Sequence, residues 1–139
     1  MVIGYLIMNT IEVKTTKRTE FIDIASKVEK IVRDAKIKEG ICVIFCPHTT
    51  AGLTINENAD PAVQKDILNH LEKLVPQDRD YSHSEGNSDG HIKSSLMGSS
   101  LNIIIENGAL ALGAWQGIYF CEFDGPRNRN VYIKIINNM

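Results

Sequence analysis

Three histidines of this 139-residue chain lie in polar segments, where an imidazole can reach a ligand. His48 directly follows an apolar run at 41–46, and His83 and His91 lie in the polar segment 76–93. Neutral imidazole is the commonest metal ligand in proteins, and three imidazoles leave one coordination position open for water or substrate. The spacing matches no compact metal motif. It therefore leaves two interpretations open: a shared metal site, or three solvated loop histidines.

Acids and amides flank these histidines in the sequence. Asn56, Glu57 and Asn58 follow a predicted strand, and Glu85, Asn87 and Asp89 belong to the polar segment. Such groups can orient metal-bound histidines by hydrogen bonding to their outer nitrogens. They are also common turn formers and helix caps, and for each residue taken alone this is the favoured interpretation. A metal-dependent hydrolase would use Glu57 or Asp89 as the base that activates a metal-bound water.

A second polar cluster surrounds a predicted tight turn at 122–129. It contains Glu122, Asp124, Arg127 and Arg129. The forked guanidinium group suits phosphate or carboxylate, which predicts an anion site. The alternative is an internal network of acids and arginines that holds the turn.

The only tryptophan, Trp115, is followed by Gln116 near the start of a predicted strand. Its ring suits a stacking wall for a flat ligand, but core packing is the favoured interpretation.

Hydrophobic periodicity indicates the elements that must position these groups. It predicts strands over 9–15, 41–46, 53–56, 101–106, 109–112, 115–123 and 129–136. It also predicts a helix over 20–36 capped by Thr19, a helix from Asp60-Pro61 to Pro76 with Leu74 on its buried face, and a short helix through Met97 capped by Asp89. Asn107-Gly108 predicts a hairpin turn between the strands 101–106 and 109–112. The continuous apolar run 41–46 predicts a strand buried on both faces. This order is typical of an α+β fold and not of a doubly wound sheet.

Length and composition indicate one domain over residues 1–139, with residues 1–7 as a possible extension or strand. The net charge of −2 gives no electrostatic reason to expect nucleic acid or an anionic membrane as a partner. No apolar run approaches the ~20 residues that a membrane span needs. The three cysteines, Cys42, Cys46 and Cys121, lie in apolar runs and predict reduced core thiols in a cytoplasmic protein.

Four motifs, in this order, closely resemble the YjbQ-like family. They are HTTAGLTINEN at 48–58, HSEGNSDGHIKSSLMG at 83–98, GAWQG at 113–117 and EFDGPR at 122–127. The similarity extends from about Ile11 to the C-terminus. It implies a compact α+β sandwich of largely antiparallel sheet, with two main helices and one short extra helix, that assembles as a homotrimer.

The resemblance also implies a metal site at His48, His83 and His91, with zinc as the expected ion and magnesium as an alternative for a diphosphate substrate. It further implies a weak thiamine-phosphate synthase activity, in which a pyrimidine methyl diphosphate alkylates a thiazole phosphate and releases diphosphate. Within the motifs we assign catalytic roles to Glu57, Asp89 and Glu122. We assign substrate binding to Thr49, Asn87, Lys93, Trp115, Gln116, Arg127 and Arg129.

Three functions are compatible with these features. The first is a small metal-assisted enzyme acting on phosphorylated heterocycles. The second is the metal-dependent hydrolase, and the third is a non-catalytic trimer that binds a metal or a small anion. The sequence contains no G-x-S-x-G nucleophile motif and no P-loop, which argues against covalent hydrolysis and nucleotide hydrolysis.

Overall fold

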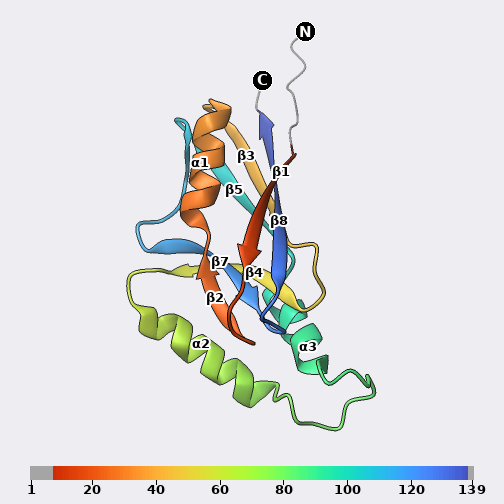
Figure 1. The fold of residues 1–139 in the computed structure, drawn as a ribbon. Coiled ribbons are helices and arrows are strands. Elements are labelled where there is room, and N and C mark those ends of the chain that lie inside the picture. Colours follow the sequence, from red (N-terminus) through yellow and green to blue (C-terminus); the bar gives the residue numbers. More distant parts are fainter. Residues whose placement is uncertain (1–7, 138–139) are drawn as a thin grey trace.

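The computed structural model describes residues 8–137, and the proposed extension at 1–7 lies outside this range. Within it the chain forms an alternating series of strands and helices (Figure 1). In chain order these are β1 (Met8–Lys14), β2 (Glu20–Asp23), α1 (Ala25–Ala35), β3 (Gly40–Phe45), β4 (Ala51–Glu57), α2 (Pro61–Leu74), α3 (Ser88–Met97), β5 (Ser100–Glu106), β6 (Ala109–Leu110), β7 (Gln116–Glu122) and β8 (Asn128–Asn137).

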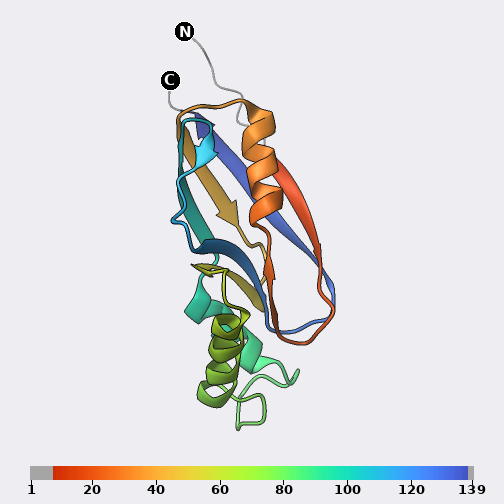
Figure 2. The ribbon, with the colours of Figure 1, turned by 90° about the vertical axis from the view of Figure 1, so that its left-hand side faces the viewer.

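The strands of residues 8–137 form two antiparallel sheets. One sheet has the order β1-β8-β3-β5-β6, and the other has the order β2-β7-β4. Figures 1 and 2 show α1 beside the end of the larger sheet near the termini, whereas α2 and α3 lie toward the opposite end. The predicted α+β fold with two main helices and one shorter helix is confirmed.

Alternation along β7 divides the interior into two hydrophobic clusters. Ile118 and Phe120 face a large core between the five-stranded sheet, α1 and one face of the smaller sheet. Tyr119 and Cys121 face a smaller core that α2 closes with Leu71. β7 is therefore buried on both faces, and the smaller sheet is the middle layer of the molecule.

Local sequence signals located several elements correctly. Asp60 caps α2, because its Oδ1 accepts a hydrogen bond from the Ala62 amide at 2.9 Å, and Pro61 begins the helix. Asn107 and Gly108 have φ values of 53° and 79° and form the predicted hairpin turn between β5 and β6. All three cysteines are buried and unpaired.

The predicted helix over 20–36 is wrong at its start. Residues 20–23 form β2, which pairs with β7, and α1 begins only at Ala25 without the predicted Thr19 cap. The reason is tertiary: as a strand, this segment places Phe21 against Tyr119 and Phe123, with ring centres 6.0 and 6.5 Å apart. The helix ends where Lys36 adopts a left-handed conformation.

The prediction that strand 41–46 is buried on both faces is wrong for the single chain. Cys42 and Ile44 are fully buried, but Ile41 and Phe45 are 43% and 42% exposed. The core-facing side of β3 meets α1 and the smaller sheet, whereas no element among residues 8–137 covers its outer side.

Two smaller expectations also fail. Leu74, predicted on the buried face of α2, is exposed, because the buried side of the helix end runs through Leu71 and Val75. Asp89 is not a cap: it lies inside the first turn of α3, and Asn87 occupies the cap position. Within residues 8–137, no helix has the length and hydrophobicity needed to cross a membrane.

Candidate functional site

His48 is held where β3 ends and the chain leaves the five-stranded sheet. Its Nε2 accepts a hydrogen bond of 2.9 Å from the backbone amide of Asn130 in β8. Its ring also meets Phe120 edge-on, with centres 6.5 Å apart. Partial burial, reinforced by the positive charge of Arg129, lowers the pKa of His48. The structure therefore favours a neutral imidazole here.

His83 and His91 come together at the start of α3. His91 lies on the helix and His83 in the loop before it, and their rings are perpendicular with centres 5.3 Å apart. Nε2 of His83 also lies 3.7 Å from the carboxylate of Glu85. The loop thus folds back so that its imidazole shares one surface with the imidazole on the helix.

Adjoining pockets link the three histidines. The first, of about 550 Å³, is lined by His48, Thr49, Ala51, His91, Ser94, Ser95, Gly98 and Ser99. The second, of about 420 Å³, is lined by Tyr81, Ser82, His83, Ser88, His91 and Ile92. His91 belongs to both pockets and therefore connects His48 with His83.

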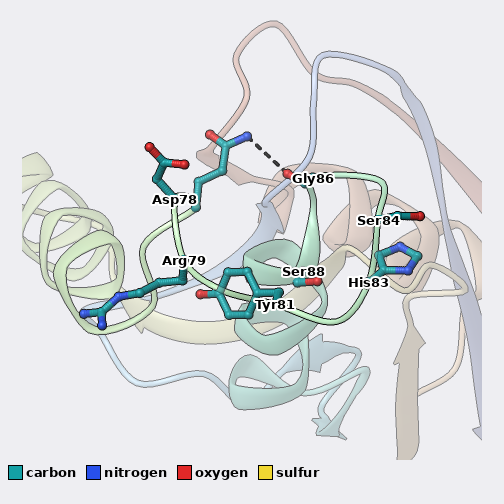
Figure 3. Close-up of a pocket in the computed structure, with 8 residues that line it drawn as sticks. Asp78, Arg79, Tyr81, His83, Ser84, Gly86 and Ser88 are labelled. Carbon is teal, nitrogen blue, oxygen red and sulfur yellow. Dashed lines mark hydrogen bonds between the residues drawn. The ribbon is translucent and has the colours of Figure 1, made fainter.

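A third pocket, of about 470 Å³, is lined by residues of the loop between α2 and α3, among them His83, and by Ser88 at the start of α3. Figure 3 shows His83 on one side of this pocket and Arg79 on the other, with Tyr81 and Ser88 between them. The Gln77 amide closes the loop by donating a 3.3 Å hydrogen bond to the carbonyl of Gly86. This pocket extends the polar surface beyond the histidines.

Asp89, assigned a catalytic role, is fully buried in an ion-pair network. Arg18 donates two hydrogen bonds to its carboxylate, at 2.9 and 3.0 Å, and Lys93 donates a third at 3.0 Å. Lys93 is itself 1% exposed and also pairs with Glu72 at 2.7 Å. Burial alone would raise the pKa of Asp89, but the bonds from Arg18 and Lys93 outweigh it and lower that pKa. Asp89 and Lys93 therefore anchor α3 and do not face the pockets.

Glu122 and Arg129 form a second buried network. Nε of Arg129 lies 2.9 Å from Oε1 of Glu122, and Thr15 donates to the same oxygen at 2.7 Å. Arg129 also donates to the Thr50 hydroxyl at 2.9 Å. Burial would raise the pKa of Glu122, yet the bonds from Arg129 and Thr15 lower it. For this pair the structure favours the internal network over anion binding.

Arg127 differs from Arg129 because its side chain is half exposed. It donates 2.9 Å hydrogen bonds to the carbonyl and to the carboxylate of Asp124. Asn87, at the start of α3, donates to the same carboxylate at 2.8 Å. Arg127 is thus tied to the α3 end of the molecule while part of its guanidinium meets solvent.

Glu57, Trp115 and Gln116 lie away from the histidines. Glu57 pairs with Gln116 at one end of β4, and Ala51 lies at the other end of the same strand. Glu57 lies six residues along this strand from Ala51, which corresponds to about 20 Å. Trp115 is 66% exposed, so core packing, the interpretation favoured from sequence, is wrong. These residues form no common site with His48, His83 and His91.

The histidines fit the implied metal only in part. Among residues 8–137, no three His, Cys, Asp or Glu side chains are arranged to hold an ion. Two imidazoles bound to one tetrahedral zinc at about 2.0–2.1 Å have ring centres roughly 5 Å apart, which the His83–His91 pair approaches. Nε2 of His48 is already occupied by the Asn130 amide.

Sequence reasoning missed the partners that fix these groups. Arg18, Glu72 and Thr15 are distant in sequence from the acids and the lysine they contact, and no local pattern marks them. Asn130 acts through its backbone amide, which is independent of residue type. Ser94 and Ser95 on α3 line the His48 pocket, and the only hint of this in the sequence is that two adjacent serines follow closely after His91.

Comparison with known proteins gives consistent results. The family model described as "UPF0047 protein YjbQ-like" matches residues 9–138. UPF0047 protein MJ1081 of Methanocaldococcus jannaschii is 55% identical over 91% of this chain and 92% of its own. UPF0047 protein YugU of Bacillus subtilis is 53% identical over 93% and 98%.

Solved structures show the same fold in relatives. A YjbQ/UPF0047 protein of Clostridium acetobutylicum is 59% identical, has a TM-score of 0.91, and matches over 92% of this chain and 99% of its own. A protein of unknown function from Sulfolobus solfataricus is 32% identical with a TM-score of 0.92, over 96% and 98%. The chain therefore belongs to the UPF0047, YjbQ-like family.

Proposed function

We propose that this protein is a small, metal-assisted cytoplasmic enzyme that acts on phosphorylated heterocycles. The activity to test is transfer of the thiamine-phosphate synthase type, in which a pyrimidine methyl diphosphate alkylates a thiazole phosphate and diphosphate leaves. One observation carries the proposal: His48, His83 and His91 line adjoining pockets that share His91. The reduced, buried cysteines support the cytoplasmic assignment.

His83 and His91 are the residues that would hold a divalent metal. Their ring spacing of 5.3 Å suits two ligands of one ion, and both side chains are reachable from solvent. A metal bound there would offset negative charge on a departing diphosphate. Zinc is the expected ion for imidazole ligands, and magnesium is the alternative when the diphosphate supplies most of the oxygens.

The protein's own groups would bind and orient the phosphorylated ligand. Thr49 and Ser99 bring hydroxyls to the His48 pocket, and Arg127 offers a half-exposed guanidinium at the α3 end of the molecule. The Asp124 carboxylate restrains Arg127 and leaves part of its donor fork free for an anion. Such preorganised donors favour a reaction whose main requirement is to stabilise a leaving anion.

The hydrolase alternative has weaker support. Asp89, one of its two proposed bases, is fully buried and paired with Arg18 and Lys93. Glu57, the other, lies at the far end of β4. The alternative that gains support is a non-catalytic metal- or anion-binding module, because the buried pairing of Asp89 and Glu122 removes two of the three assigned catalytic acids.

We further propose that the protein assembles as a homotrimer through the outer face of the five-stranded sheet. Ile41 pairs with Ile104 on β5 and with Ile136 on β8, so three exposed isoleucines form a row across the sheet. Phe45 continues the apolar surface along β3. A continuous apolar run such as 41–46 is typical of a strand buried on both faces. Self-association through the outer face would bury the side of β3 that is exposed in the single chain.

Metal and ligand binding test this proposal. Zinc and inorganic diphosphate would be titrated into the wild type and into His83→Ala, His91→Ala and His70→Ala at pH 7.5. His70, exposed on α2, provides the matched control. We expect one zinc per chain in the wild type and in His70→Ala, and none in the other two variants. A wild type that holds no zinc after zinc is supplied, or a loss of zinc binding in His70→Ala alone, would contradict the site.

A further inference from the structure

The hydrogen bond between Asn130 and His48 follows from where β3 ends. Along β8, Tyr132 is the last residue that pairs with β3, opposite Phe45. Two residues earlier, Asn130 presents its amide on the side where β3 no longer runs. The imidazole of His48 occupies that place and accepts the bond at 2.9 Å. A side chain thus takes over the position of the missing strand.

This bond determines which nitrogen of His48 carries the proton. A backbone amide can only donate, so Nε2 must be the unprotonated acceptor. A neutral imidazole carries its single proton on the other nitrogen, which is Nδ1. Nδ1 has no hydrogen-bond partner within residues 8–137 and is not enclosed by them. His48 therefore presents an N–H donor outward.

A metal ligand needs a free lone pair, and His48 has none to offer while this bond persists. Binding through Nε2 would require the Asn130 amide to be released, and binding through Nδ1 would require a doubly deprotonated ring. The three-histidine metal site implied by the family resemblance therefore does not fit His48 in this structure.

We propose that His48 is a hydrogen-bond donor to a phosphoryl oxygen of the ligand and not a metal ligand. The identity of the acceptor rests on the proposed function. The pocket itself supports an oxygen acceptor, because His48 shares it with the hydroxyls of Thr49 and Ser99.

The serines on α3 sharpen this assignment. Ser94 donates to the carbonyl of Thr49 at 2.7 Å, and Ser95 donates to the carbonyl of His91 at 3.0 Å. The hydroxyl protons of both serines therefore already donate to backbone carbonyls and are not available to a ligand. The N–H of His48 is the donor in this pocket whose direction the sheet fixes, so it sets the orientation of the bound oxygen.

The test combines nitrogen NMR with binding measurements on the full chain. In ¹⁵N-histidine-labelled protein at pH 7.5, we expect His48 to be protonated at Nδ1 and to remain so when zinc is added. Inorganic diphosphate should shift Nδ1 of His48 and slow exchange of its proton. A proton on Nε2, a zinc-bound nitrogen of His48, or no response to diphosphate would each overturn the proposal.

Two variants provide a second readout. His48→Ala should keep the zinc stoichiometry of the wild type and weaken inorganic diphosphate binding roughly 10- to 100-fold, as expected for a lost bond to a charged group. His48→Asn, whose amide can donate from near the position of Nδ1, should recover part of that binding. Loss of zinc in His48→Ala would identify His48 as a ligand and reject the inference. A wild type without zinc would reject the metal part of the proposed function, while the NMR spectrum would still decide the state of His48.

Discussion

Arg18 and Asp89 form a two-point ion pair between segments 71 residues apart in the sequence, with nitrogen–oxygen distances of 2.9 and 3.0 Å. Arg18 lies between β1 and β2, and Asp89 lies in the first turn of α3 beside His91. The pair therefore links the start of the fold to the helix that carries a proposed metal ligand. It accounts for how a polar loop can end in a fixed position.

Replacing Asp89 with Ala should destabilise the protein strongly. The change leaves Arg18 and the buried Lys93 without their shared partner, and loss of one member of a buried ion pair costs about 3–5 kcal/mol. Urea denaturation measures the loss. Lys30→Ala, which removes the exposed pair with Asp34, is the control and should leave the free energy of unfolding nearly unchanged. Equal effects of the two changes would show that the Asp89 network is not structural.

Stability should fall in acid because the pKa values of Asp89 and Glu122 are lowered in the folded chain. The unfolded chain then binds protons more readily, so the stabilisation is complete above the unfolded pKa values. It is lost as the pH falls below about 4.5 and through the folded values. Urea midpoints between pH 7 and pH 3 measure this dependence.

Glu122→Gln should flatten that acid dependence, whereas Glu106→Gln, at an exposed strand end, should leave it close to the wild type. A midpoint in the wild type that stays constant from pH 6 to pH 3 would contradict the role of the buried carboxylates.

Changing Ile104 to Glu should dissociate the proposed trimer. Ile104 is 64% exposed in the row of isoleucines on the outer face, and a charge there would be desolvated by self-association. Sedimentation velocity would measure the mass. Leu74→Glu, at a leucine 62% exposed on α2, is the matched control and should remain trimeric. A monomeric wild type, or dissociation by Leu74→Glu alone, would show that the interface lies elsewhere.

The three cysteines should react with a thiol reagent much faster after unfolding than in the native protein. All three are buried, and burial raises the pKa of Cys42 to about 11, so little thiolate is available at neutral pH. We expect three free thiols in denaturant without reductant and slow labelling of the native protein. A disulfide in the purified protein would contradict both the fold and the cytoplasmic assignment.

Short-range signals located most of the elements. The Asp60-Pro61 start of α2 and the Asn107-Gly108 turn depend on neighbouring residues only, and both predictions are confirmed. Residues 20–23 were assigned to the wrong type of element because their environment is created by β7, a hundred residues later. A pattern within one segment does not contain that information.

The site was predictable as a set of segments but not as a set of contacts. The spacing of His83 and His91 indicated a polar loop, and the structure brings their rings together. The sequence did not distinguish the buried Arg129 from the half-exposed Arg127, because Thr15 and Glu122, which surround Arg129, approach it only in the folded chain. The direction of the His48 ring depends on a backbone amide in β8.

The most direct measurement is formation of thiamine phosphate from a pyrimidine methyl diphosphate and a thiazole phosphate, in the presence of zinc or magnesium. The account predicts that the wild type and His70→Ala form the product above the uncatalysed background. His91→Ala should lose at least about 100-fold, as expected when a group that offsets leaving-group charge is removed. A wild type that binds metal but forms no product, or His91→Ala variants with full activity, would contradict the proposed enzyme.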